Sequence, residues 1–352
     1  MTSFRSSLGR VAVAMLSFAA CTGIASAADI SGAGATFPYP LYAKWADAYK
    51  TKTGVGLNYQ SIGSGGGIKQ IQAKTVTFGA TDAPLSKEEL EQSGLVQFPM
   101  VMGGVVPVIK LEGIKPGEVV LDGPTLADIF MGKIKKWNDD AIAKLNPGVK
   151  LPNTAIAVVH RSDGSGTTYN FTYYLGAVSP SWKEEIGVDK SVEWPVGIGG
   201  KGNEGVASMV AQTEGSIGYV EYAYALENDM TWTKMKNKDG QTVSPDIDAF
   251  QAAAANADWK NTPGFGVILA NQPGPETWPM TAATFILVHK QPENPANVQA
   301  ALKFFAWAYE EGDEMAEQLH YVPMPDNVVK MVKKSWAESI KDSSGKAIWT
   351  AE

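Results

Sequence analysis

The stretch Arg161-Ser162-Asp163-Gly164-Ser165-Gly166-Thr167 lies between an apolar run at 155–160 and a helix-forming run at 169–175. This order predicts a strand, a tight loop and a helix. The first N–H groups of such a helix have no partner inside it, and the helix dipole makes that end positive. The loop therefore predicts a binding site for an anion, built from backbone amides, hydroxyls and one guanidinium.

Arg161 stands out because the chain has only three arginines, Arg5, Arg10 and Arg161. The first two lie in an N-terminal segment that we expect to be removed. Arginine presents a planar, permanently charged fork that holds an oxyanion through two hydrogen bonds, whereas lysine is a point charge. A solitary guanidinium favours an oxyanion site, with an ordinary surface turn and helix cap as the alternative.

Length and charge narrow the classes of function. The 352 residues carry a net charge of −7, from 30 basic and 37 acidic side chains, and 44% of the residues are hydrophobic. This composition is ordinary for a globular protein of two domains or one large one. Because the chain is acidic and has no basic run, nucleic acid is not an expected partner. An anion must then be held by local dipoles and a placed cation, which suits a buried site.

The first 28 residues have the composition of a signal peptide. Arg5 and Arg10 supply a positive start, residues 11–20 an apolar core, and Ala25-Ser26-Ala27 a cleavage motif. We expect cleavage near Ala27/Ala28 and an exported protein. No later run has the roughly 18 apolar residues of a transmembrane helix.

Cys21 is the only cysteine of the chain. If it leaves with the signal, the mature protein can form neither a disulfide nor a thiolate metal site. The alternative is a lipoprotein in which Cys21 becomes the lipidated first residue. Phe18, at a position where an aliphatic residue is usual, argues against this alternative.

Segments with strand and helix character alternate along the rest of the chain, which predicts an α/β fold with largely parallel sheets. Ligands of such sheets bind at the carboxyl ends of strands. Polar loops of the required kind occur at 35–37, 63–65 and 81–82, in addition to 161–167. Two of the helices that follow glycine loops are predicted at 68–74 and 206–212. Extended runs at 102–109 and 281–289 are candidates for strands that cross between domains.

Asp82 directly follows the apolar strand predicted at 76–80. It is either an ordinary residue of a helix-entry turn or a carboxylate placed beside the anion. A carboxylate accepts a hydrogen bond from an anion that keeps a proton, as phosphate does near neutral pH, and repels one that keeps none, as sulfate. In the second interpretation Asp82 selects phosphate, because sulfate would leave a buried charge unpaired. Asp163 either orients Arg161 or is a turn residue.

Other motifs give weaker signals. The pattern Gly197-x-Gly199-x-x-Gly202 formally matches a dinucleotide-binding loop, but Trp194-Pro195 before it is a poor central strand. The three histidines, His160, His289 and His320, are scattered along the chain, which argues against a metal cluster or a catalytic triad. His160 next to Arg161 keeps a phosphatase possible, although no nucleophile with its base is evident.

Several motifs together resemble a family, the periplasmic phosphate-binding proteins of phosphate-specific ABC transporters. The resemblance covers essentially the whole mature chain, and no single motif would be specific alone. The motifs are Gly32-Ala33-Gly34-Ala35-Thr36-Phe37-Pro38, Tyr59-Gln60-Ser61-Ile62-Gly63-Ser64-Gly65-Gly66-Gly67, Phe78-Gly79-Ala80-Thr81-Asp82-Ala83-Pro84, Leu121-Asp122-Gly123, the Arg161–Thr167 loop, and Gly218-Tyr219-Val220-Glu221-Tyr222.

The resemblance implies the two-lobed α/β fold of type II periplasmic binding proteins, with mostly parallel sheets and a ligand cleft between the lobes. Residues 29–103 and 275–352 would form the first lobe and residues 104–274 the second, with crossings near 103–108 and 272–284. By matching positions, the phosphate-binding groups would be Thr36, the Phe37 amide, Ser64 and Asp82 from the first lobe, and Arg161, Ser165, the Gly166 amide and Thr167 from the second.

The resemblance further implies a high-affinity orthophosphate-binding protein that hands its ligand to the permease of an ABC transporter for import. Such a protein would be a periplasmic monomer, with no catalytic residue, metal or cofactor. Two alternatives remain from the residues alone. One is a phosphate-ester hydrolase, and the other is a binder of another tetrahedral oxyanion such as sulfate.

Overall fold

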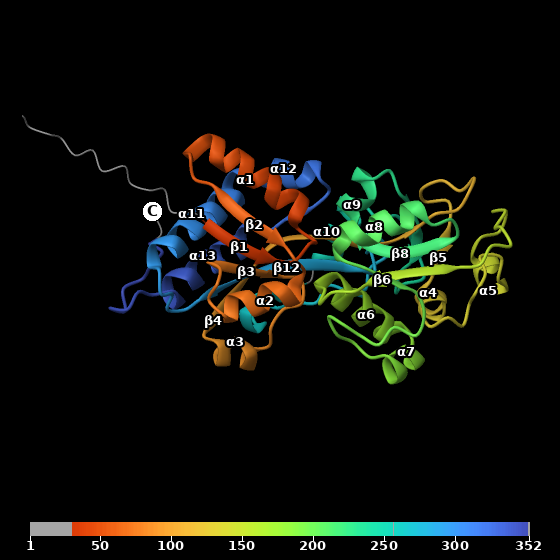
Figure 1. The fold of residues 1–352 in the computed structure, drawn as a ribbon, viewed down its shortest axis with the longest axis horizontal. Helices are drawn as coiled ribbons and strands as arrows, with labels where there is room; N and C mark the ends of the chain where they lie inside the picture. Colours follow the sequence, from red (N-terminus) through yellow and green to blue (C-terminus); the bar gives the residue numbers. More distant parts are fainter. Residues whose placement is uncertain (1–29, 256, 351–352) are drawn as a thin grey trace, which may run out of the picture.

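The computed structural model describes residues 30–255 and 257–350, so the predicted signal peptide, with Cys21 and the Ala27/Ala28 cleavage site, lies outside the described residues. Strands and helices alternate along the described chain (Figure 1). The strands are β1 (Ile30–Gly34), β2 (Leu57–Ser61), β3 (Phe78–Thr81), β4 (Leu95–Ile109), β5 (Val120–Leu121), β6 (Ala157–Arg161), β7 (Ile198–Gly200), β8 (Ser216–Glu221), β9 (Thr231–Trp232), β10 (Lys234–Lys236), β11 (Thr242–Val243), β12 (Thr281–His289) and β13 (Val322–Pro323).

Most of the helices directly follow a strand in the chain. They are α1 (Tyr39–Thr53), α2 (Ser64–Gln72), α3 (Lys87–Ser93), α4 (Gly123–Phe130), α5 (Asp140–Leu145), α6 (Gly166–Val178), α7 (Pro180–Glu185), α8 (Gly202–Gln212), α9 (Tyr222–Glu227), α10 (Ile247–Ala254), α11 (Pro295–Glu311), α12 (Asp313–Gln318) and α13 (Asp326–Ser339). Within residues 30–255 and 257–350, none of the helices combines the length and apolar character needed to cross a membrane.

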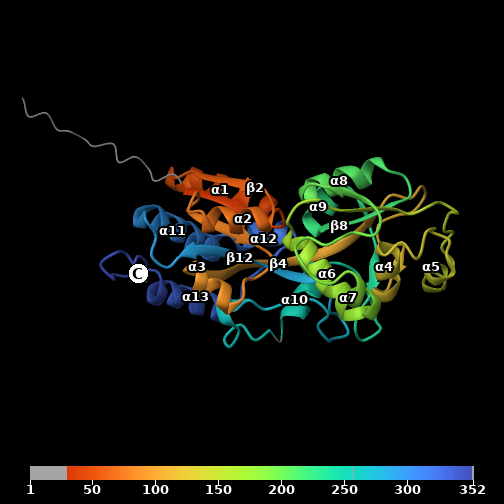
Figure 2. The ribbon, with the colours of Figure 1, turned by 60° about the horizontal axis from the view of Figure 1, so that its bottom comes forward.

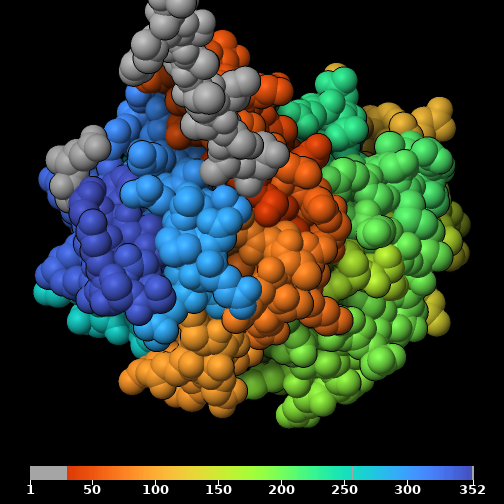
Figure 3. Space-filling model, turned by 60° about the vertical axis from the view of Figure 1, so that its left-hand side comes forward, coloured from red at the N-terminus to blue at the C-terminus, as the bar shows by residue number. Residues whose placement is uncertain are grey.

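The molecule has two lobes that lie side by side along its long axis, and a view turned by 60° shows the same division (Figures 1 and 2). One lobe contains both ends of the described chain, with β1, β2 and β3 beside α11 and α13. The other contains the middle of the chain, with β6, β8 and α4 to α8. On the face seen in Figure 3, the red-to-orange and blue parts of the chain lie against each other. This is the two-lobed α/β fold that the sequence predicts.

Most strands of both lobes form one sheet with the order β2-β1-β3-β12-β4-β8-β6-β7, in which β9 and β13 also pair with β4, while β11, β10 and β5 form a separate small sheet. Its outer strands are parallel, β1 with β2 and β3, and β6 with β7 and β8. Its centre is antiparallel, because β12 pairs with β3 and β4, and β4 pairs with β8. The sheet is therefore mixed rather than largely parallel. The reason is that β4 runs out of one lobe toward the other, while β12 runs back.

Strand β4 connects the two halves of the sheet and is buried along its whole length. Its first part pairs with β12 up to Gly104, and its last part, from Val105 to Ile109, pairs with β8. Gly104 lies at this change of partner. A Cβ there would approach the Phe250 ring to 2.1 Å, so glycine allows α10 to pack against the strand.

Fully buried tryptophans attach the loops and helices around this sheet. Three of them donate the indole N–H to a backbone carbonyl of a distant segment, which satisfies the buried donor. Trp45 on α1 donates to Gly312 at 3.1 Å, Trp137 to Gly215 at 2.8 Å, and Trp278 to Val105 at 2.9 Å. These three bonds tie segments that are far apart in the sequence to one another inside the core.

Candidate anion-binding site

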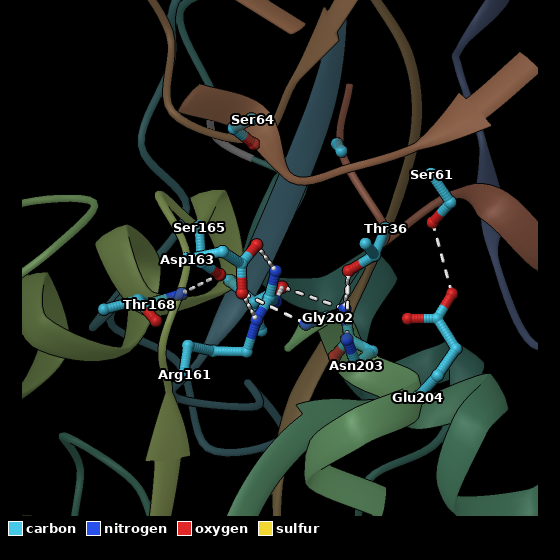
Figure 4. A network of polar contacts seen from close by, with 12 residues as sticks. Thr36, Ser61, Ser64, Arg161, Asp163, Ser165, Thr168, Gly202, Asn203 and Glu204 are labelled. Carbon is cyan, nitrogen blue, oxygen red and sulfur yellow. Dashed lines mark hydrogen bonds and ion pairs between the residues drawn. The ribbon is translucent and has the colours of Figure 1, made fainter. Parts of the chain in front are cut away.

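Connections from both lobes bring polar side chains to one place between the lobes (Figure 4). Thr36 and Asp82 follow β1 and β3, and Ser64 begins α2. Across from them, the Arg161 loop connects β6 to α6. The predicted polar side chains Thr36, Ser64, Asp82, Arg161, Ser165 and Thr167 are all 3% exposed or less. Side chains far apart in the sequence therefore meet in a buried position at the carboxyl ends of strands.

The first-lobe residues are fixed by hydrogen bonds. Ser64 Oγ accepts the N–H of Asp82 at 3.1 Å. The Thr36 carbonyl accepts the hydroxyl of Tyr224 at 2.6 Å. This carbonyl shares its peptide group with the Phe37 N–H, so the bond polarises that amide as a donor. Phe37 itself is completely buried, so only its backbone can serve a ligand.

Asp82 supplies an acceptor among these donors. Within the described residues its Oδ1 atom has no hydrogen-bond partner, although it is buried. Burial raises the pKa of Asp82 to about 7, and the nearby Thr284 hydroxyl, the charge of Arg161 and the Ser64 hydroxyl lower it only in part. A buried carboxyl with one unpartnered oxygen and a pKa near neutrality is typical of a functional group rather than of a turn residue.

Arg161 is held by Asp163 in a bidentate ion pair. Nε contacts Oδ1 at 2.8 Å and Nη2 contacts Oδ2 at 2.6 Å, and Oδ1 also accepts the N–H of Gly202 at 3.0 Å. Burial raises the pKa of Asp163, but its bonds to Arg161 and Gly202 outweigh this and leave the pKa below the usual value. With a third contact, Nη1 to Thr167 Oγ1 at 3.4 Å, three of the five guanidinium N–H groups have partners among residues 30–255 and 257–350, and the other two are available to a ligand. Asp163 therefore orients the guanidinium.

Helix α6 begins at Gly166, three residues before its predicted start, so Gly166 and Thr167 lie in its first turn. Ser165 is the N-cap, and its Oγ accepts the N–H of Thr168 at 3.0 Å. Helix α2 likewise begins at Ser64 rather than at residue 68. Two helix N-termini, one from each lobe, thus contribute partial positive charge to the site.

The lobes touch each other at this site. The N–H of Gly65 donates to the carbonyl of Gly164 at 2.8 Å, from one lobe to the other. A Cβ on Gly166 would lie 2.4 Å from Ser64 Oγ and 2.6 Å from Asp82 Oδ2, so no other residue fits there. Polar groups from opposite lobes are therefore in close contact at this site.

Two residues of this network are not predicted from the sequence, Asn203 and Tyr224. Asn203 contacts Thr36 and Thr167, and Tyr224 contacts the Thr36 carbonyl. Helix α8 begins at Gly202 instead of residue 206, which places Asn203 in its first turn. The glycine loop before α8, of the same kind as those before α2 and α6, is the signal that points to Asn203.

The weaker motifs have structural explanations. In the pattern that matches a dinucleotide loop, β7 ends at Gly200, and the N–H of Gly202 is already bound to Asp163. His160 stacks on Trp194 with the ring centres 4.7 Å apart, and burial lowers its pKa although a bond to the Arg161 backbone raises it. Over the ranges 30–255 and 257–350, no three side chains of metal-binding type gather in one place.

Two lobes that enclose a site of helix N-termini, hydroxyls and one guanidinium define the periplasmic-binding-protein class. Residues 22–311 match the family described as the PBP superfamily domain. The phosphate-binding protein PstS of Pasteurella multocida is 55% identical over 323 residues, which cover 92% of this chain and 94% of that protein. PstS of Haemophilus influenzae is 55% identical over 317 residues, 90% of this chain and 95% of that protein. The chain belongs to the PBP superfamily and, within it, to the PstS phosphate-binding proteins.

Solved structures share the fold. The phosphate-binding protein from Stenotrophomonas maltophilia aligns with a TM-score of 0.68, covering 91% of this chain and 98% of that one, at 21% identity. A putative phosphate ABC transporter substrate-binding protein from Clostridium perfringens, solved with bound phosphate, aligns with a TM-score of 0.62 at 20% identity, covering 84% and 100%. At such identities the likeness concerns the architecture alone.

Proposed function

We propose that the protein binds inorganic phosphate between its lobes and delivers it to the permease of an ABC transporter for import. The identity of 55% with PstS proteins over nine-tenths of the chain supports this function. The observation that carries it is Asp82, a buried carboxyl whose Oδ1 has no partner in the part of the chain that the structure describes, set among donors from both lobes. This arrangement suits a tetrahedral anion that keeps one hydrogen.

The phosphate would be held by groups from both lobes. Thr36, the Phe37 amide and Ser64 donate from the first lobe, and Asp82 accepts the hydrogen of the ligand. Arg161 donates its free N–H groups from the second lobe, together with Ser165, the Gly166 amide and Thr167. Neither half of this set surrounds an ion alone, so binding favours the closed arrangement of the lobes.

Closure over the ligand requires two bodies that move relative to each other. Residues 29–103 and 275–352 would move as one body and residues 104–274 as the other. The crossings would lie near 103–108, where β4 changes its pairing partner, and near 272–284, before and within the start of β12. Bending at these crossings would break the Gly65–Gly164 hydrogen bond between the lobes and would open the site.

The protein would act as a monomer in the periplasm, after removal of a signal peptide near Ala27/Ala28, and would need no cofactor. It would catalyse no reaction. The residues around the site support this, since Arg161 is paired with Asp163 and His160 is stacked on Trp194, so that neither is arranged to activate a nucleophile.

Titration of the purified protein with phosphate and, separately, with sulfate tests the function. The ten tryptophans should report closure as a fluorescence change with phosphate and no change with equimolar sulfate. Calorimetry of the same pairs gives the affinities. An equal response to both anions would contradict the role of Asp82, and release of nitrophenol from p-nitrophenyl phosphate would contradict a purely binding function.

A further inference from the structure

Asn203 occupies a position from which it controls two hydroxyls of the site. It is completely buried and is the second residue of α8, in the second lobe. Its side chain lies between Thr36 and Thr167, so it touches one hydroxyl from each lobe (Figure 4 shows Thr36 and Asn203). No contact with a ligand is needed for the effect that follows.

The orientation of the Asn203 amide is set by an independent contact. Its Oδ1 accepts the backbone N–H of Glu221 at 2.9 Å. A backbone N–H can only donate, so the oxygen must face Glu221 and the NH₂ group must face the threonines. The two hydrogens of Nδ2 are then donated to Thr36 Oγ1 at 2.7 Å and to Thr167 Oγ1 at 3.1 Å.

Both hydroxyl oxygens are fully occupied as acceptors. Thr36 Oγ1 also accepts the backbone N–H of Asn203 at 3.1 Å, and Thr167 Oγ1 also faces Arg161 Nη1 at 3.4 Å. A hydroxyl has two acceptor positions and one hydrogen, so each of these threonines has only its hydrogen left to offer. Among the described residues neither hydroxyl donates to the protein.

We propose that Asn203 is a positioning residue that forces the hydroxyls of Thr36 and Thr167 to act as donors toward the bound anion. Free hydroxyls donate or accept as the ligand demands, whereas these two can only donate. Two of the four hydroxyls of the site are thereby excluded as acceptors, which leaves fewer places for a second hydrogen of the ligand and favours a phosphate with one hydrogen, directed at Asp82. This inference rests on the proposed function and adds the rule by which the protonation state of the ligand is selected.

Asn203 can hold both hydroxyls only when the lobes are together, because Thr36 belongs to the first lobe and Asn203 to the second. In an open form the Thr36 hydroxyl would be free to rotate. Closure therefore both surrounds the ligand and fixes the direction of a donor that contacts it, which makes closure more favourable for the correct ligand.

The test is the phosphate affinity of Asn203→Ala and of the unmodified protein at about pH 5.5 and about pH 8.5, where phosphate is mainly the monoanion and mainly the dianion respectively. Without the amide, the threonines can accept a second ligand hydrogen. We expect the affinity for the dianion to fall about tenfold, because the Thr36 and Thr167 hydroxyls both become weaker donors. The affinity for the monoanion should fall much less. The charged and titratable groups around the hydroxyls are unchanged between the two proteins: Asp82, Arg161, Asp163, Lys201, Glu204, Glu221, Tyr219 and Tyr224.

Asn146→Ala is the matched control. Asn146 is a buried amide of the same lobe, and its side chain makes three hydrogen bonds, to Val120 and Ile142, away from the site. The Asn146→Ala substitution should lower the stability of the protein without changing the pH profile of phosphate binding. Equal losses at both pH values in Asn203→Ala would overturn the inference, while absence of phosphate binding by the unmodified protein would overturn the proposed function instead.

Asn203→Asp covers the case in which the alanine variant does not fold. It keeps the shape and the bond to Glu221 but replaces the NH₂ group, with its two donated hydrogens, by one acceptor oxygen, so both hydroxyls should donate to that oxygen and turn away from the ligand. We expect a loss of more than tenfold at about pH 8.5, with partial recovery at about pH 5.5 as the new carboxyl takes up a proton. Affinity equal to that of the unmodified protein at the higher pH would refute the proposal.

Discussion

Replacing Asp82 by asparagine should stabilise the ligand-free protein, although it damages the site. Burial raises the pKa of Asp82 from 3.8 to about 7. Since one pH unit corresponds to about 1.36 kcal/mol, ionising this carboxyl costs the folded protein roughly 4 kcal/mol more than the unfolded chain. Asn has the same size and no charge. Asp82→Asn removes that cost, and the value is an upper figure because the site can relax.

The effect must depend on pH with a definite sign. The pKa of Asp82 is higher in the folded than in the unfolded state, so its favourable contribution is present at low pH and is lost as the pH rises to about 7. The free energies of unfolding of the two proteins should therefore change together below about pH 4 and diverge steadily up to about pH 7. Urea unfolding without phosphate, at a series of pH values, measures the difference.

Asp163→Asn is the control with the opposite sign. The pKa of Asp163 is lowered, because its bonds with Arg161 outweigh its burial, so its contribution is present at neutral pH and is lost on acidification. This variant should be less stable than the unmodified protein at neutral pH. A stability difference between Asp82→Asn and the unmodified protein that stays constant from about pH 4 to about pH 8 would refute the assignment of a raised pKa to Asp82.

Three further changes test the site. Arg161→Lys loses the planar fork, and phosphate affinity measured by calorimetry should fall by about 1–3 kcal/mol; unchanged affinity would argue against the site. Gly166→Ala places a methyl 2.4 Å from Ser64 Oγ, so X-ray scattering with saturating phosphate should show a less compact protein, and full compaction would contradict the contact. Tyr224→Phe removes the bond to the Thr36 carbonyl and should weaken phosphate binding by about 1 kcal/mol in calorimetry, with unchanged affinity arguing against polarisation of the Phe37 amide.

The fold and much of the site can be predicted because the informative residues are local in the sequence. A strand, a glycine and hydroxyl loop and a helix recur around Ser64 and Arg161, and the structure has strands and helices in this order. The carboxyl ends of strands share an edge, which explains why loops far apart in the chain meet. The mixed sheet is harder to foresee, since the direction of β12 relative to β4 depends on how the chain returns to its first lobe.

The errors lie at helix starts. Helices α2, α6 and α8 begin three or four residues earlier than predicted, inside loops rich in glycine. Glycine disfavours a helix by about 1 kcal/mol, so propensity moves the predicted start past it. At position 166 the contact between the lobes requires glycine at the start of the helix, because a larger residue would collide with Ser64. The late predicted start of α8 also explains why Asn203 is not predicted. The sequence places Asn203 in the loop before the helix, whereas the structure places it in the first turn of the helix.

Selection by hydrogen count follows from the charge balance of the site. The protein carries a net charge of −7, and its one guanidinium at the site is already paired with Asp163, so net charge cannot explain the binding of an anion. The attraction must come from oriented dipoles, which are the amides of helix N-termini and hydroxyls with fixed hydrogens. These dipoles all point a hydrogen at the ligand. They therefore attract a ligand oxygen that presents a lone pair and repel one that presents a hydrogen. In the proposed site Asp82 is a carboxyl acceptor among these donors, and it therefore favours a ligand that carries a hydrogen.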